Sequence, residues 1–228
     1  GFDGIAIAQS SKVQGFNVTK EQLALAVAKE VPAADGKSLI ANPYKKWSDI
    51  SNNLPNREII VYGPPKSSGT RDSFEELVLQ SVFEKKAVYT DLFKKDEVAN
   101  KKYKAYSEIR TDGAYVESGE NDNLIVQKLT KNEAAVGIFG YSFLAENKDK
   151  VVGLSIDNIF PTVETIANSS YPVARSMSFY IKNQHTKDVP ALNQFNKLFV
   201  SEKMIGKDGV LTELGLIPLT DDVRTKAR

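Results

Sequence analysis

Residues 59–74 read IIVYGPPKSSGTRDSF and form the junction that decides how this chain folds. The apolar, β-branched run from Glu58 to Tyr62 predicts a strand, which must end at Gly63-Pro64-Pro65 because proline cannot donate to a sheet ladder. From Asp72 onward the side chains expected on one helix face recur at helical spacing, at Phe74, Leu77, Val78, Ser81 and Val82. The chain therefore passes from a strand, through a short loop, directly into a helix.

This loop-to-helix junction is predicted to bind an anion. The first backbone N–H groups of a helix have no intrahelical acceptor and lie at the positive end of the helix dipole. Ser68 and Thr70 add hydroxyl donors, and Gly69 allows a ligand to approach the backbone closely. Arg71 supplies a planar guanidinium that matches a tetrahedral oxyanion.

The same residues permit a simpler interpretation. Ser67 or Ser68 could only cap the helix, with Arg71 and Asp72 solvated in its first turn. An arginine in the first turn, however, opposes the helix dipole. Its presence is easier to explain if a bound anion offsets both positive charges.

Strands and helices alternate along the rest of the chain. Thr19 and Gln22 have the spacing of a capping box, which predicts a helix over 19–30. Further elements are expected as strands at 1–8, 135–140, 151–156 and 176–181 and as helices at 123–130, 192–199 and 211–214, with Gly215 as the C-terminal cap of the last. This alternation predicts an α/β protein with mainly parallel strand pairing.

Composition limits the possible partners. The 30 basic and 29 acidic side chains give a net charge of +1, so the chain has no large field of one sign for nucleic acid or an anionic membrane. It has no cysteine for a disulfide or thiolate site and no apolar run long enough to cross a bilayer. Because the first residues already read as a strand, we expect further residues before Gly1.

Motifs for nucleotide binding and catalysis are not found. The lysine precedes the glycine where a Walker A loop needs the reverse order, and a dinucleotide fingerprint needs more spaced glycines than this stretch has. The only histidine, His185, lies in a polar stretch and is expected to be solvated. Glu117, Glu120 and Asp122 are interpreted as a solvated loop rather than a metal site. No catalytic residue, metal site or cofactor is predicted.

Several segments, in order, carry a resemblance to a known family. The sequence resembles the periplasmic phosphate-binding proteins of ABC transporters, the PstS family, in the stretches DGIAIA at 3–8, WSDI at 47–50, SGTRD at 68–72, GENDN at 119–123 with AVGIFGY at 135–141, and SYP at 170–172.

The resemblance implies a type II periplasmic-binding-protein fold, in which two lobes close on the ligand at a two-stranded hinge. Residues 8–172 would form one complete lobe, while 1–7 and 173–228 would supply a hinge strand and the C-terminal part of the other. That second lobe would be incomplete, because the family's usual N-terminal segment has no counterpart here. The segment normally carries an Asp that discriminates phosphate from sulfate.

The resemblance also implies roles for individual residues. Ser68, Gly69, Thr70 and Arg71 would bind phosphate, with support from Ser67 or Asp72. Many family members carry an arginine just before the SGT motif. Two prolines occupy that region here, at positions 64 and 65, so the arginine's role is assigned to Arg71.

The function implied is that of a monomeric, periplasmic or secreted receptor that is not an enzyme. It would capture phosphate and present it to an ABC-type membrane permease. Alternatives remain open: a binding protein for sulfate, molybdate or a phosphonate, or a binding or adhesion module of the same fold that has lost transport. This chain alone, with half a site, is expected to bind phosphate weakly.

Overall fold

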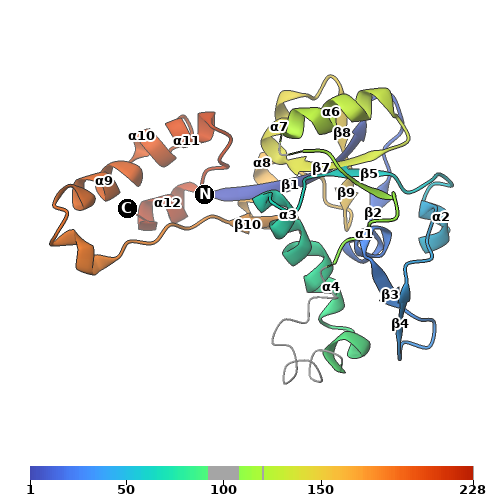
Figure 1. The fold of residues 1–228 in the computed structure, drawn as a ribbon. Coiled ribbons are helices and arrows are strands. Elements are labelled where there is room, and N and C mark those ends of the chain that lie inside the picture. The colour runs from blue at the N-terminus through green and yellow to red at the C-terminus, as the bar shows by residue number, and fades with distance from the viewer. Residues whose placement is uncertain (92–107, 120, 228) are drawn as a thin grey trace.

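The computed structural model describes residues 1–91, 108–119 and 121–227, and its centre is one mixed β-sheet (Figure 1). The strands follow the spatial order β10-β1-β7-β5-β6, and β8 pairs with β1 beside this path. Their bounds are β1 Phe2–Ser10, β5 Val61–Gly63, β6 Tyr115–Glu117, β7 Val136–Gly140, β8 Val151–Gly153 and β10 Ala174–Ser176. The sheet, with helices around it, confirms the predicted α/β class.

The expectation of mainly parallel pairing is wrong for the longest strand. β5 runs parallel to β6 and β7, but β1 pairs antiparallel with β7, β8 and β10. Strand–helix alternation fixes direction only within a βαβ unit. The partners of β1 lie more than a hundred residues later, beyond the reach of that rule.

Two smaller sheets flank the central one. β2 (Asn17–Val18) pairs parallel with β9 (Ser155–Ile156), and β3 (Glu30–Pro32) pairs antiparallel with β4 (Leu39–Ala41). The strand predicted at 151–156 is therefore divided between two sheets. The division falls at Leu154, whose N–H donates to the carbonyl of Ile7 at 2.7 Å.

Helices cover both faces of β1. Its alternate side chains Ile5 and Ile7 join the larger core with Phe74, whereas Ala6 and Ala8 join a smaller one. The helices over these faces include α1 (Lys20–Val27), α6 (Asp122–Lys131), α7 (Tyr141–Glu146) and α8 (Val163–Ala167), and α2 (Trp47–Ile50) buries its tryptophan. The capping box predicted at Thr19 and Gln22 is confirmed at the start of α1.

The helix after β5 is not a uniform α-helix. It consists of α3 (Gly69–Phe74), a π-helical segment η1 (Glu75–Gln80) and α4 (Ser81–Phe83). Its fully buried apolar side chains are Phe74, Val78, Leu79 and Phe83, while the predicted Leu77, Ser81 and Val82 are only partly buried. The predicted helix is confirmed, but its predicted buried face is partly wrong.

The strand predicted at 176–181 is also wrong, since β10 ends at Ser176. Phe2 pairs with Ser176, and Met177 donates to the carbonyl of Gly1 at 2.8 Å. The paired residues of this ladder run from Gly4 with Ala174 to Phe2 with Ser176.

The chain after β10 forms short helices around loops. They are η3 (Asn183–Thr186), α9 (Ala191–Phe199), α10 (Glu202–Ile205), α11 (Val210–Glu213) and α12 (Asp221–Ala227). His185 is exposed, as predicted, and Gly215 has φ +97° just after α11, which confirms it as the glycine that ends that helix.

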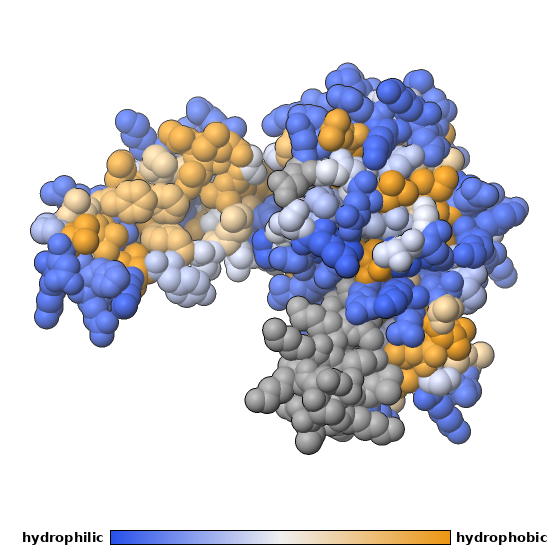
Figure 2. All heavy atoms as spheres, in the orientation of Figure 1, coloured by the Kyte–Doolittle hydropathy of each residue, from blue (hydrophilic) through white to orange (hydrophobic). Residues whose placement is uncertain are grey.

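This C-terminal segment, residues 177–227, projects from one end of the sheet (Figure 1). Besides the β1–β10 ladder, a bridge between Phe2 and Ile217 joins it to the rest of the fold. Within the described part of the segment, Ile217 is the one fully buried apolar side chain. Figure 2 shows apolar atoms gathered on its surface, where Phe195, Leu198 and Leu214 are all more than half exposed.

Across the described residues, no helix combines the length and apolarity that crossing a bilayer requires.

Candidate functional site

Three parallel strands end at the same edge of the sheet. At their carboxyl ends β5 and β6 lead through loops into α3 and α6, and β7 leads directly into α7. In open α/β sheets this edge is where ligands bind. The predicted anion-binding residues lie at the end of the loop between β5 and α3 and in the first turn of α3.

Ser68 is the N-cap of α3. Its hydroxyl accepts from the N–H of Thr70 at 3.2 Å, and the N–H of Ser68 itself donates to Pro65 at 3.0 Å. Gly69 faces open space, because a Cβ built there would have no neighbour within 4 Å. Ser68 therefore caps the helix as the simpler interpretation predicts, while the backbone at Gly69 stays open to a ligand.

The two residues predicted to support the site lie on either side of this cap. Ser67 and Asp72 are both exposed, and the N–H of Asp72 donates to the carbonyl of Ser68 at 3.2 Å. The structure thus brings Ser67, Ser68, Gly69, Thr70 and Asp72 together around one helix start.

Arg71 is buried, with a side chain only 3% exposed, so the simpler interpretation, in which Arg71 is solvated, is wrong for this residue. Its Nε donates to Glu75 at 2.6 Å, and its Nη1 donates to the carbonyl of Pro64 at 3.3 Å and lies 3.5 Å from Glu117. The guanidinium is held beneath the loop by groups of the protein itself.

Tyr115 on β6 completes this arrangement. Its ring lies under the Arg71 guanidinium, 4.7 Å from Cζ to ring centroid, and its hydroxyl donates to the carbonyl of Pro64 at 2.8 Å. Burial raises the pKa of the Tyr115 hydroxyl to about 12. A Cβ at Gly63 would lie 2.1 Å from that oxygen, so glycine is required there. The sequence analysis did not predict that Tyr115, Glu75 and Glu117 contact Arg71. The spacing of four residues between Arg71 and Glu75 is, however, a signal for an ion pair on one helix face.

The first residue of α6, which follows the loop after β6, is a buried acid. Asp122 is 8% exposed, and its Oδ2 accepts from the N–H of Gly140 at 3.1 Å. Its burial raises the pKa of the carboxyl above its ordinary value. The predicted solvated loop is therefore wrong at Asp122. Glu117 is exposed as predicted, but it ends β6 and lies 3.5 Å from Arg71, while Glu120 lies outside the described residues. In the described part of the chain, acidic and histidine side chains form no cluster that could hold a metal ion.

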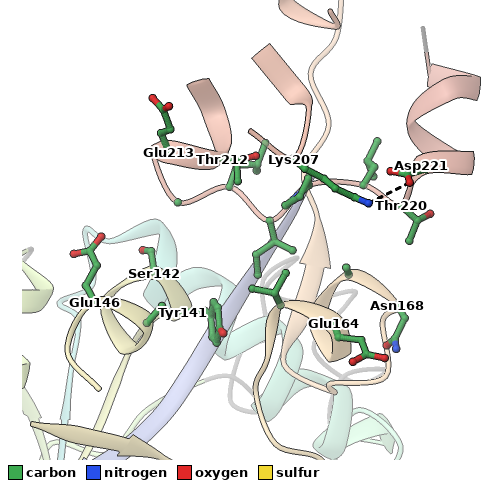
Figure 3. A pocket seen from close by; sticks show the side chains of 18 residues that line it. Tyr141, Ser142, Glu146, Glu164, Asn168, Lys207, Thr212, Glu213, Thr220 and Asp221 are labelled. Atoms are coloured by element: carbon green, nitrogen blue, oxygen red, sulfur yellow. Dashed lines mark hydrogen bonds and ion pairs between the residues drawn. The ribbon is translucent and has the colours of Figure 1, made fainter. Parts of the chain in front are cut away.

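A groove lies elsewhere, between helices α7 and α8 and the stretch 207–221 of the C-terminal segment (Figure 3). Its volume is about 950 Å³, and its lining includes Tyr141, Val163, Leu216 and Pro218. None of the predicted anion-binding residues contributes to it.

Comparison with known proteins gives matches over most of the chain. A family model described as PBP superfamily domain matches residues 1–203. The phosphate-binding protein PstS of Staphylococcus epidermidis is 28% identical over 203 residues, which cover 84% of this chain and 53% of that protein. The PstS protein of Staphylococcus haemolyticus is also 28% identical, with 84% and 55% covered. The chain thus spans about half the length of these curated relatives.

Solved structures match the fold. A possible phosphate binding protein from Planctomyces limnophilus superposes with a TM-score of 0.68 at 24% identity, over 99% of this chain and 68% of that one. PstS from Borrelia burgdorferi gives 0.63 at 20% identity, over 96% and 70%. These likenesses confirm the predicted periplasmic-binding-protein fold and the resemblance to PstS proteins.

Proposed function

This chain belongs to the PBP superfamily, and from that membership we propose that it binds inorganic phosphate and delivers it to an ABC-type membrane permease. The observation that carries the proposal is the open, capped helix start at Ser68, Gly69 and Thr70, at the carboxyl edge of the sheet. Relatives with the name phosphate-binding protein PstS match across this region. Helix N-termini of this form bind phosphate and similar anions.

In this proposal the backbone N–H of Gly69 and the hydroxyl groups of Ser68 and Thr70 donate to the anion. Arg71 contributes positive charge from beneath the loop, where Glu75 and Glu117 hold it. Ser67 and Asp72 lie at the edge of the site and support it.

We propose further that residues 8–172 form one complete lobe, with hinge strands at its ends. Residues 1–7 and 173–228 then contribute a hinge strand and the C-terminal part of a second lobe. Two observations support this division: the segment after β10 buries almost no apolar side chain, and the solved neighbours contain a portion of fold that this chain does not cover.

The family and the relatives are binding proteins, and we propose that this chain is likewise a receptor without enzymatic activity. On the same relationship we propose that the protein is a periplasmic or secreted monomer. Since the donors at a helix start do not by themselves choose among tetrahedral anions, sulfate, molybdate and phosphonates must be tested beside phosphate.

The test is a titration followed by amide chemical shifts in ¹H–¹⁵N NMR spectra, which detect binding even in the millimolar range expected for half a site. Phosphate should shift the amides of Gly69 and Thr70 first. Thr70→Val should weaken phosphate binding about tenfold, because it removes a hydrogen bond to a charged group. The matched control is Thr130→Val, which removes an exposed hydroxyl in α6.

Two results would contradict the proposal. Phosphate could leave the amides of residues 67–72 unshifted, or Thr70→Val could bind as tightly as the parent chain. A larger response to sulfate or molybdate would keep the site and replace the ligand.

A further inference from the structure

The groove between α7, α8 and residues 207–221 is assembled from two parts of the chain (Figure 3). One wall is the lobe, with Tyr141 and Val163, and the other is the C-terminal segment, with Leu216 and Pro218. The walls approach each other at Gly215, where a Cβ would lie 2.9 Å from the Cβ of Ser142. The hydrogen-bonded ion pair between Lys207 and Asp221, 3.1 Å long, adds polar contacts to the second wall.

The groove has an apolar floor that stays accessible. Val163 is 50% exposed, and Leu216 and Pro218 are only partly buried. A volume of about 950 Å³ lies at the upper end of the roughly 300–1,000 Å³ usual for small-molecule pockets, but here the sides are open rather than enclosing. Such a surface suits apolar side chains presented by a longer partner better than a small molecule.

The rim of the groove is acidic. Glu146 at the end of α7, Glu164 in the first turn of α8 and Glu213 at the end of α11 all line it and are exposed. Within the described structure none of these three forms an ion pair. Lys207 is the one basic residue of the lining, and it is already paired with Asp221. The chain as a whole carries +1, so this negative charge is local.

We propose that this groove is a docking surface for a basic, amphipathic peptide segment of a partner protein. Apolar side chains of the segment would pack on Val163 and Leu216, and its lysines or arginines would pair with Glu146, Glu164 and Glu213. The charge complementarity selects this occupant over an acidic or purely polar one. A segment that contacts both walls also fixes the lobe and the C-terminal segment in one relative orientation.

The experiment uses a fluorescein-labelled helical peptide of leucine and lysine with all leucines on one face. Binding to the intact chain is followed by fluorescence anisotropy at several salt concentrations. A leucine–glutamate peptide of the same pattern and a lysine-only peptide are the comparison probes. The leucine–lysine peptide should bind, and the other two should not.

Variants locate the binding on the groove. Glu146→Gln with Glu164→Gln should weaken binding about fivefold at low salt and less at high salt, since two exposed ion pairs are lost. The control pair Glu76→Gln with Asp188→Asn removes the same charge from exposed positions elsewhere. Val163→Ser should weaken binding at every salt concentration, whereas Phe195→Ser, on the exposed face of α9, should not.

Three outcomes would overturn the proposal. The peptide could fail to bind, it could bind the glutamine pair as tightly as the parent chain, or Phe195→Ser could weaken it while Val163→Ser does not. The last would place the peptide on the C-terminal segment instead.

Discussion

At the scale of single residues, Arg71 has the nearby negative charge that its position predicted, but the protein itself supplies that charge. An arginine in the first turn of a helix does need negative charge nearby, as its position indicated. The protein supplies that charge from Glu75 and Glu117, so Arg71 alone is not evidence for a bound anion. Removal of one partner from a buried ion pair typically destabilises a protein by about 3–5 kcal/mol. Arg71→Ala would therefore confuse stability with binding, whereas Thr70→Val does not.

Asp112 provides a residue-scale prediction about pH. Hydrogen bonds from the buried Arg110, and then from Lys45, hold the pKa of its carboxyl well below its ordinary value. A lowered pKa in the folded state stabilises the fold above the unfolded-state value of about 3.9, and this stabilisation is lost as pH falls below it. We expect Asp112→Asn to lower the free energy of unfolding by about 1 kcal/mol at pH 7, a modest value because Asp112 is 40% exposed.

The measurement is urea denaturation of the parent chain and Asp112→Asn at pH 7 and near pH 3. The difference between the two should shrink at the lower pH. Asp188→Asn, in an exposed turn, is the control and should behave as the parent at both values. A difference that is constant with pH would show that Arg110 does not stabilise the ionised Asp112.

At the scale of elements, the π-helical segment explains why the predicted buried face was partly wrong. A regular α-helix brings Phe74, Leu77 and Val78 to one face. The wider π turn of η1 instead aligns residues five apart, so Phe74 shares its face with Leu79, and Val78 shares its face with Phe83. A periodicity of 3.6 residues cannot reveal a local change to a wider turn.

A pair of leucine variants tests this register. Leu79 is fully buried, so Leu79→Ala should cost about 2–5 kcal/mol through lost contacts and a residual cavity. Leu77 is only partly buried, so Leu77→Ala should cost about 1 kcal/mol or less. Chemical denaturation gives both values under the same conditions. Equal losses, or a larger loss for Leu77→Ala, would mean that the helix is α-helical in solution and buries the face that the sequence pattern predicts.

Elements set by short-range signals were predictable, and those set by distant partners were not. The capping box at Thr19 and the glycine at position 215 act within one helix turn, and both predictions are confirmed. The position of β10 depends on its pairing with β1, near the other end of the sequence. The same distinction applies to the candidate site. The helix cap at Ser68 could be predicted from the local sequence, whereas Tyr115 contacts Arg71 only because β5 pairs with β6.

At the scale of the whole molecule, the C-terminal segment differs from the rest in how little it buries. Ordering one residue costs roughly 1.5 kcal/mol of conformational entropy, which burial of apolar surface normally offsets. After β10, Ile217 is the one fully buried apolar side chain among the described residues. The ring of Phe199 stacks on Phe195 and meets Phe179 edge-to-face, yet α9 has no buried residue. We therefore expect this segment to be only marginally stable unless a further layer covers its exposed apolar side chains.

Hydrogen exchange measured by mass spectrometry tests that conclusion against a matched helix in the same chain. α6 and α9 are helices of similar length, but α6 buries Ile125, Val126 and Leu129. In dilute solution the amides of α9 should exchange at least about tenfold faster than those of α6, because local opening of α9 exposes little new apolar surface. If the amides of α9 exchange as slowly as those of α6, and this protection does not fall on dilution, the conclusion that α9 needs a covering layer is wrong. Protection that depends on concentration would identify a second copy of the chain as the covering layer, since only association changes with dilution.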